Sequence, residues 1–169
     1  MTDTQQTLIL IKPDGVRRNL IGEIVGRIEA KGYVIADIKK VSATRALLAA
    51  HYAEHEGKPF YEPLVDFMLS GEIVAIRAEG HRVIEGFRSL AGATDPTTAA
   101  PGTIRGDLGR DWGLKVAQNL VHGSDSPESA AREFLRVVTP LGDYACTRLP
   151  QGLNLSAPAF QDFMEKHIA

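Results

Sequence analysis

Short apolar runs alternate with stretches of helical periodicity along this chain of 169 residues. The run Thr7–Lys12 (T-L-I-L-I-K) is almost continuously apolar and stops at Pro13-Asp14-Gly15, which predicts a buried strand followed by a turn. Strands are also expected over residues 34–41, 72–79 and 114–121. Because segments with helical spacing separate these strands, the chain is expected to fold as one sheet with helices packed on it.

The expected helices begin at recognisable capping residues. Thr44 precedes a helix from Arg45 to about Glu54, and Ser126 precedes a helix that has Pro127 at its first position. Residues 91–113 are rich in Gly, Pro and Thr and are expected to form a long loop, a type of segment that is usually functional or disordered. The other helices are expected near residues 20–30, 64–69, 83–90 and 158–166.

Composition limits the classes of function. The formal net charge of −2 excludes a broadly basic nucleic-acid binder and leaves room for a local basic pocket. Cys146 is the only cysteine, so no disulfide can form within the chain. The polar N-terminus lacks the features of a secretory signal, and no apolar run approaches the length of about 20 residues that spans a bilayer. We therefore expect a cytoplasmic protein without a membrane segment.

The segment Asn119–Ser126 (N-L-V-H-G-S-D-S) is the strongest chemical signal in the sequence. It places His122 at or just past the end of an expected strand and beside the start of a helix. Imidazole has an unperturbed pKa of about 6.5, so it is largely neutral and nucleophilic near neutral pH. A helix start offers unpaired backbone N–H groups, which favour anions. A histidine packed in a turn is the simpler interpretation; the neighbouring motifs favour a nucleophile that attacks phosphorus.

Four motifs in the same order resemble nucleoside diphosphate kinase: K-P-D-G at 12–15, K-P-F-Y at 58–61, P-G-T-I-R-G-D at 101–107 and N-L-V-H-G-S-D-S at 119–126. The resemblance covers roughly residues 7–138. It implies an α+β, ferredoxin-like βαββαβ antiparallel sheet and assembly into a homo-oligomer, either a hexamer or a tetramer. It also implies transfer of the terminal phosphate of a nucleoside triphosphate to a nucleoside diphosphate, by a ping-pong route through a phosphohistidine.

The resemblance assigns a role to each matching residue. His122 is the expected nucleophile, Glu133 the carboxylate that orients its ring, and Ser124 the hydroxyl that holds this carboxylate. Phe60 is expected to stack on the base, with Leu64 behind it. Side chains around the phosphates and ribose are expected to take the part that a P-loop backbone plays elsewhere, and they are Lys12, Tyr52, Arg88, Thr94, Arg105 and Asn119. Mg²⁺ is expected to arrive with the nucleotide phosphates, without a metal site made by the protein alone.

Each assignment has a purely structural alternative. Lys12 and Arg88 could be solvated surface charges, Tyr52 could pack in its helix, Phe60 could anchor a loop, and Glu133 could face solvent. His51 and His55 stand four residues apart, but the sequence between them lacks the pattern of a zinc motif, so we expect no zinc site there. Two aspartates are expected to satisfy backbone N–H groups in turns rather than to act as acid–base partners, and they are Asp107 and Asp125.

The sequence departs from compact members of the family in two places. Residues 108–115 look like an insertion beside the expected active site, and a C-terminal extension begins at about residue 150. We expect all 169 residues to form a single domain. The rival interpretation is a nucleotide-binding or scaffolding oligomer without turnover. It would be favoured by replacement of His122, Lys12 or Arg105, none of which is replaced, and the negative net charge argues against a dominant nucleic-acid role.

Overall fold

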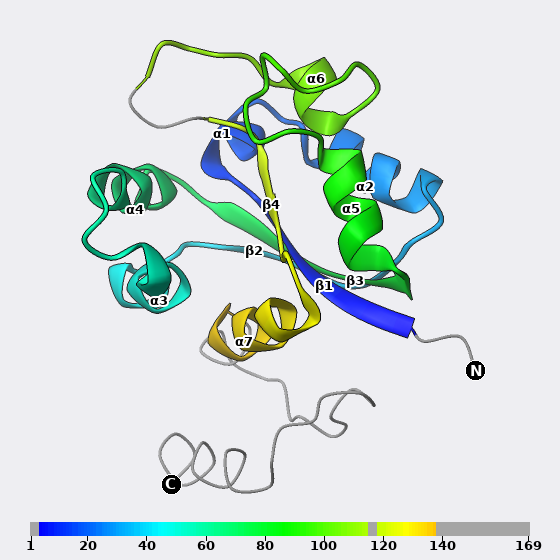
Figure 1. Cartoon of the computed structure of the whole chain (residues 1–169), viewed down its shortest axis with the longest axis horizontal. Coiled ribbons are helices and arrows are strands. Elements are labelled where there is room, and N and C mark those ends of the chain that lie inside the picture. Colours follow the sequence, from blue (N-terminus) through cyan, green and yellow to red (C-terminus); the bar gives the residue numbers. More distant parts are fainter. Residues whose placement is uncertain (1–3, 115–117, 138–169) are drawn as a thin grey trace, which may run out of the picture.

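The computed structural model describes residues 4–114 and 118–137 (Figure 1). Its elements, in chain order, are β1 (Thr4–Ile11), α1 (Pro13–Arg17), α2 (Ile21–Ala30), β2 (Val34–Val41), α3 (Arg45–His51), the 3₁₀ turn η1 (Ala53–His55), α4 (Tyr61–Leu69), β3 (Ile73–His81), α5 (Val83–Ala91), α6 (Ile104–Leu108), β4 (Val121–Gly123) and α7 (Pro127–Val137).

The four strands form one sheet in the order β2-β3-β1-β4, and every neighbouring pair is antiparallel. The two long central strands, β1 and β3, pair over the whole of β1, from Thr4 opposite His81 to Ile11 opposite Val74. The helices α3 and α4 occupy the connection between β2 and β3. This arrangement confirms the expected α+β, ferredoxin-like antiparallel fold.

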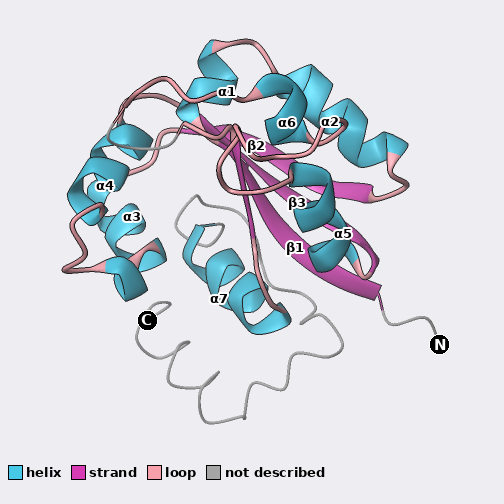
Figure 2. Cartoon of the chain, turned by 45° about the horizontal axis from the view of Figure 1, so that its top comes forward, coloured by secondary structure: helices cyan, strands magenta, loops and turns pink. Residues whose placement is uncertain are grey.

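Helices bury both faces of the sheet, and the pattern of β1 explains how (Figure 2). Successive residues of a strand point to opposite faces. Ile9 and Ile11 pack in one core cluster with residues of α2 and α5, whereas Leu8 and Leu10 pack in a second cluster with residues of α3 and α4. A strand buried on both faces needs apolar residues at every position, which is why this segment is a continuous apolar run.

The expected strand over residues 114–121 is wrong in the part of it that the structure describes. β4 contains only Val121–Gly123, so His122 lies inside the strand rather than at its end. The extended backbone is interrupted at Leu120, which has a φ of 71°, in the left-handed region. This interruption fixes where the strand begins.

The expected long loop over residues 91–113 contains the short helix α6. Thr103 caps this helix, because its Oγ1 accepts a hydrogen bond from the N–H of Gly106 at 3.0 Å. Because the segment is rich in Gly, Pro and Thr, Thr103 could not be recognised from the sequence as the cap of a helix. The expected turn at residues 13–15 likewise opens a helix, α1, with Pro13 in its first turn.

The other expected helix starts are confirmed. Thr44 Oγ1 accepts from the N–H of Leu47 at 3.2 Å, and Ser126 Oγ accepts from the N–H of Ser129 at 3.1 Å. The helix that was expected to run to about Glu54 ends at His51 and continues as η1. The expected helix at 158–166 and the extension from about residue 150 lie outside the described residues, and the single-domain boundary stays a prediction.

The segment that follows α6 carries the only tryptophan of the chain, Trp112. The guanidinium carbon of Arg110 lies 4.1 Å from the centroid of this ring, and that of Arg18 lies 5.8 Å away. Arg18, which follows α1, also donates from Nη1 to the carbonyl oxygen of Leu108 at 2.6 Å. The segment is thus attached to the end of α1. Within the described ranges, no helix is long and apolar enough to cross a membrane.

Candidate active site

β4 places His122 on the sheet face that α3 and α7 cover. His122 pairs with Leu10 of β1, and Gly123 pairs with Ile9. Because directly paired residues point to the same face, His122 shares the face of Leu10. A Cβ at Gly123 would lie 2.5 Å from Cδ1 of Phe87, so this position needs glycine for close packing against α5. The two neighbouring residues therefore have different roles: His122 presents its side chain on this face of the sheet, and Gly123 allows α5 to pack closely.

A chain of polar contacts holds the His122 ring. Its Nε2 lies 3.2 Å from Oε1 of Glu133, and Ser124 Oγ donates to Oε2 of the same carboxylate at 2.5 Å. The N–H of Leu8 donates to Ser124 Oγ at 3.3 Å, and this bond links the series of polar contacts to the central strand β1. Burial opposes ionisation of Glu133, but the hydrogen-bonding and electrostatic interactions with His122, together with the hydrogen bond from Ser124 and the interaction with His51, outweigh it and lower the pKa of this carboxyl.

An ionised Glu133 sets the tautomer of His122. A carboxylate only accepts hydrogen bonds, so the facing Nε2 of a neutral imidazole carries the proton. The lone pair is then left on Nδ1. The contact with Glu133 thereby prepares one ring nitrogen of His122 as a nucleophile.

Lys12 connects the end of β1 to the segment that precedes β4. Its Nζ donates to Oδ1 of Asn119 at 2.7 Å, and Nδ2 of Asn119 donates to the carbonyl oxygen of Thr94 at 2.8 Å. Lys12 is only 8% exposed. Burial, together with the charge of Arg105, lowers the pKa of Lys12 to about 8. The ammonium is therefore held in place but poorly solvated, a state that an anionic ligand would relieve.

The K-P-D-G motif also fixes the backbone at Leu120. The backbone N–H of Lys12 donates to the carbonyl oxygen of Leu120 at 2.8 Å, and Oδ2 of the buried Asp14 accepts from the N–H of Leu120 at 3.1 Å. These two bonds hold Leu120 in its left-handed conformation. A Cβ at Gly15 would lie 2.8 Å from Cγ2 of Ile11, so this motif is tightly packed. We did not single out Asp14 from the sequence.

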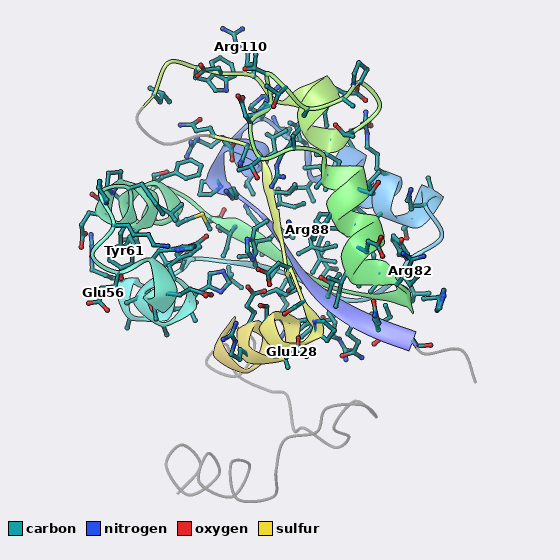
Figure 3. The ribbon with its side chains drawn as sticks, in the orientation of Figure 1. Glu56, Tyr61, Arg82, Arg88, Arg110 and Glu128 are labelled. Atoms are coloured by element: carbon teal, nitrogen blue, oxygen red, sulfur yellow. The ribbon has the colours of Figure 1, made fainter. Side chains whose placement is uncertain are left out.

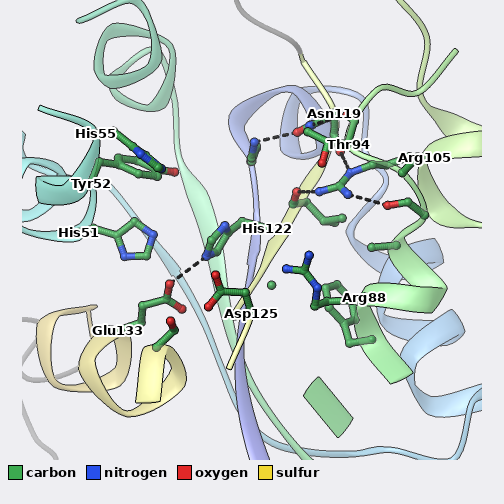
Figure 4. A pocket seen from close by; sticks show the side chains of 18 of the residues that line it. His51, Tyr52, His55, Arg88, Thr94, Arg105, Asn119, His122, Asp125 and Glu133 are labelled. Atoms are coloured by element: carbon green, nitrogen blue, oxygen red, sulfur yellow. Dashed lines mark hydrogen bonds and ion pairs between the residues drawn. The ribbon is translucent and has the colours of Figure 1, made fainter. Parts of the chain in front are cut away.

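Two arginines contribute in different ways. Arg105 donates to the carbonyl oxygens of Gly92 and Val121 at 2.8 Å each and to that of Asn119 at 3.1 Å. Burial and the charge of Arg88 lower the pKa of Arg105 to about 10. The side chain of Arg88 extends from α5 towards His122 (Figures 3 and 4). Arg105 thus joins α6 to two other segments, at Gly92 and at residues 119–121, while the exposed Arg88 is positioned to meet a ligand.

These side chains surround a cavity of about 370 Å³ (Figure 4). Eight of the eleven residues expected in the site line it, and they are Lys12, Tyr52, Arg88, Thr94, Arg105, Asn119, His122 and Glu133. Burial, and to a lesser degree the charge of Glu133, raises the pKa of Tyr52, so this phenol stays neutral. Residues from six separate parts of the sequence therefore meet in one place.

The other three expected residues lie outside the lining. Ser124 is buried behind Glu133, as its hydrogen bond shows. Phe60, which is 46% exposed, lies just before α4, with its ring centroid 5.5 Å from that of His55, a lining residue. Leu64 lies in α4 and packs against the second core cluster.

Three lining residues were considered in the sequence but given no place in the site, and they are His51, His55 and Asp125. The ring of His51 lies edge-on to that of His122, with centroids 5.1 Å apart. Asp125, expected in a turn, also lines the cavity, and a hydrogen bond from Ser129 lowers its pKa. Asp107 satisfies a backbone N–H as expected, since its Oδ1 accepts from the N–H of Gly102 at 2.8 Å, but it lies in helix α6 and its Oδ2 also pairs with Arg27 at 2.7 Å. No sequence spacing signals the approach of His51 to His122.

Comparisons with known proteins agree with this fold. The family model for nucleoside diphosphate kinase matches residues 5–140. A nucleoside diphosphate kinase of Mycolicibacterium vanbaalenii is 60% identical over 132 residues, which are 78% of this chain and 94% of the relative. A crystal structure of the enzyme from Encephalitozoon cuniculi aligns with a TM-score of 0.74 at 38% identity, covering 79% of this chain and 88% of that one.

A structure of the enzyme from Halobacterium salinarum, in complex with CDP, also aligns with a TM-score of 0.74. It is 44% identical, and the alignment covers 79% of this chain and 86% of that one. The fold and these matches define a phosphotransferase that acts on nucleotides. More specifically, the chain belongs to the nucleoside diphosphate kinase family, whose general mechanism passes a terminal phosphate between nucleotides through a phosphohistidine.

Proposed function

We propose that His122 is the residue that carries the phosphoryl group in this chain. The observation that supports this role is the contact of Nε2 with Glu133, which leaves the lone pair on Nδ1. That lone pair attacks the terminal phosphorus of a nucleoside triphosphate, and the bond from this phosphorus to the bridging oxygen breaks. The bonding electrons leave with the nucleoside diphosphate. The acceptor diphosphate then removes the phosphoryl group by the reverse of this step.

The basic residues of the cavity neutralise the charge that develops on the phosphate oxygens. Arg88 offers a forked donor suited to these oxygens, and Lys12 supplies a buried point charge. Arg105 adds positive charge and also holds the backbone of Asn119 and Val121 in place. Tyr52, Thr94 and Asn119 complete the lining on the phosphate and ribose side. Positioning and charge neutralisation are the main demands of phosphoryl transfer.

The nucleotide enters as its Mg²⁺ complex, with the ion on the phosphate oxygens. Among the described residues, one group of three or more potential metal ligands is close enough to hold an ion, and it contains two histidines, whereas Mg²⁺ prefers oxygen ligands. Phe60 stacks on the base and Leu64 supports it, so all common nucleoside tri- and diphosphates are accepted. The expected cytoplasmic location belongs to this proposal.

The proposal includes a homo-oligomer, a hexamer or a tetramer. β2 is an edge strand of the sheet, and it exposes two large apolar side chains, Val34 at 62% and Ile38 at 44%. An edge strand with apolar side chains is a common site of association between chains. These features support association and leave the number of subunits open.

A labelling experiment tests the phosphohistidine. The protein is incubated with γ-labelled ATP and Mg²⁺ without an acceptor and is then separated under alkaline denaturing conditions. We expect an acid-labile, alkali-stable label that is discharged onto added GDP. The label should be absent from a His122→Ala variant. Label that survives in this variant would move the phosphorylated residue elsewhere, and no label in the wild type, with ATP binding intact, would favour the scaffolding role.

Replacing Glu133 with glutamine is expected to lower kcat by about 10- to 100-fold, the cost typical of losing a partner that orients a reactive imidazole. Glutamine keeps the size of the side chain but removes the negative charge that holds Nε2–H. The measurement is steady-state kinetics with ATP and a diphosphate acceptor. Glu128→Gln, an exposed position on the same helix, is the matched control and should leave kcat unchanged. Equal effects at the two positions would remove Glu133 from the mechanism.

The charge of Lys12 predicts an alkaline decline in kcat/KM. Because burial lowers the pKa of Lys12 to about 8, its cationic form prevails below this pH and is lost as the pH rises through it. The pH dependence of kcat/KM reflects ionisations in the free enzyme, so kcat/KM should fall above about pH 8. An arginine keeps its charge there, so the decline should move to higher pH in Lys12→Arg. Superimposable profiles for the two proteins would assign the decline to another group.

A further inference from the structure

His51 lies in the cavity beside the expected nucleophile. It is the last residue of α3, is only 6% exposed, and presents its ring edge-on to His122, with an interplanar angle of 78°. One potential ligand atom each from His51, His122 and Glu133 lie within 4.8 Å of one another. Three different elements, α3, β4 and α7, thus bring two imidazoles and one carboxylate to a single point (Figure 4).

This set of donors matches a transition metal ion rather than Mg²⁺. Two histidine nitrogens and one glutamate oxygen are a common Zn²⁺ ligand set when a fourth position is left for water or substrate. Ligands about 2.0–2.2 Å from a tetrahedral ion lie roughly 3.3–3.6 Å apart. His122 Nε2 and Glu133 Oε1 are already 3.2 Å apart. The ligand atom of His51 lies within 4.8 Å of the other two, so it must approach them by at most about 1.5 Å to complete the site.

We propose that His51, His122 and Glu133 form a Zn²⁺ site and that Zn²⁺ bound there blocks phosphorylation of His122. The ion enters from the cavity, to which all three side chains contribute. Lys12, Arg88 and Arg105 line the same cavity and repel a cation, so direct ligation by the two imidazoles and the carboxylate must hold the ion. The metal site stands independently of the assigned nucleophile, whereas the block rests on the proposed role of His122.

The block follows from the two nitrogens of one imidazole ring. Zn²⁺ on Nε2 takes the position of the proton that faces Glu133, and a neutral ring then carries its single proton on Nδ1. The lone pair that would attack phosphorus is thereby occupied by a proton. Zn²⁺ on Nδ1 would occupy that lone pair directly. In both cases the ring has no nitrogen left with which to accept a phosphoryl group.

Direct binding of Zn²⁺ to the nucleotide-free protein tests the site, with a chromogenic chelator as competitor. We expect one Zn²⁺ per chain at neutral pH and a loss of affinity of more than about tenfold in His51→Asn. His55→Asn is the matched control, because His55 also lines the cavity but is not in the ligand group; it should bind Zn²⁺ like the wild type. No binding by the wild type, or equal binding by both variants, would overturn the site.

A second measurement uses only the wild-type protein, so it does not depend on whether a variant folds. Metal-free protein that has been phosphorylated by excess ATP and freed of nucleotide should bind added Zn²⁺ much more weakly than the unphosphorylated protein, because His122 and the space beside it are then occupied. Zn²⁺ added first should in turn slow labelling from γ-labelled ATP at a fixed excess of Mg²⁺. Undiminished Zn²⁺ binding by the phosphorylated protein would overturn the assignment of His122 as a ligand. A protein that binds Zn²⁺ through His51 but is never labelled would contradict the proposed nucleophile alone.

Discussion

Replacement of His122 by alanine is expected to abolish phosphoryl transfer while nucleotide binding persists. The variant lacks the nitrogen that attacks phosphorus, and loss of a nucleophile costs at least about 10⁴-fold in turnover. The charged residues that meet the phosphates, Lys12, Arg88 and Arg105, are unchanged, so the affinity for ADP should stay within a few-fold of the wild type. Calorimetric titration with Mg²⁺–ADP and a coupled transfer assay measure the two quantities on one sample.

His55→Ala is the matched control for this prediction. His55 lines the same cavity, but its Nδ1 lies 3.2 Å from Nζ of Lys58 rather than near Glu133. It should retain most of the transfer activity. If His122→Ala kept more than a small fraction of wild-type turnover, or lost ADP binding together with activity, His122 would be a structural residue of the cavity and the nucleophile would be elsewhere.

Replacement of Gly106 by alanine is expected to destabilise the fold by more than about 3 kcal/mol. An added Cβ would lie 2.0 Å from the carbonyl oxygen of Ala100 and 2.7 Å from its carbonyl carbon. These are backbone atoms, so the loop before α6 must move as a whole. Thr103, whose Oγ1 caps α6, would be displaced as well, because this atom lies 2.8 Å from the added Cβ. Urea unfolding at equilibrium measures the change.

Gly26→Ala provides the comparison in the same protein. Gly26 lies inside α2, and a Cβ there would have no heavy atom within 4 Å apart from its own helix and chain neighbours. Alanine is the better helix former, so this change should stabilise the protein by about 0.5–1 kcal/mol. Similar unfolding midpoints for the two variants would show that the loop before α6 gives way easily, and Arg105 would then be less firmly held than its three carbonyl contacts indicate.

Local sequence signals predicted the framework of the fold well. The apolar run of β1 and the caps Thr44 and Ser126 depend on neighbours in sequence, and all three are confirmed. The start of β4 could not be predicted in this way. It is set by Leu120, whose backbone is held by Lys12 and Asp14, more than a hundred residues away. A contact between residues that are distant in the sequence cannot be read from the local pattern of residue types.

In the candidate site, too, the sequence indicated some residues, whereas others depend on contacts between distant parts of the chain. Resemblance named residues in separate motifs, and the structure brings Lys12, Arg105 and His122 to one cavity. His51 was missed because its spacing relates it to His55 on the same helical stretch. Its contact with His122 arises only when α3 packs on the face of the sheet from which His122 projects. Asp14 was missed because a turn residue in sequence became a buried acceptor in three dimensions.

Trp112, whose ring contacts the guanidinium groups of Arg18 and Arg110, gives the protein an optical probe of its own. Since the chain has one tryptophan, indole emission reports on the segment after α6 and not on the cavity, whose lining does not include Trp112. Arg18 attaches this segment to the end of α1. Fluorescence during unfolding therefore follows the release of this one attachment, whereas far-ultraviolet circular dichroism follows the sheet and helices. Coincidence of the two curves would mean that the segment melts as part of the same cooperative unit.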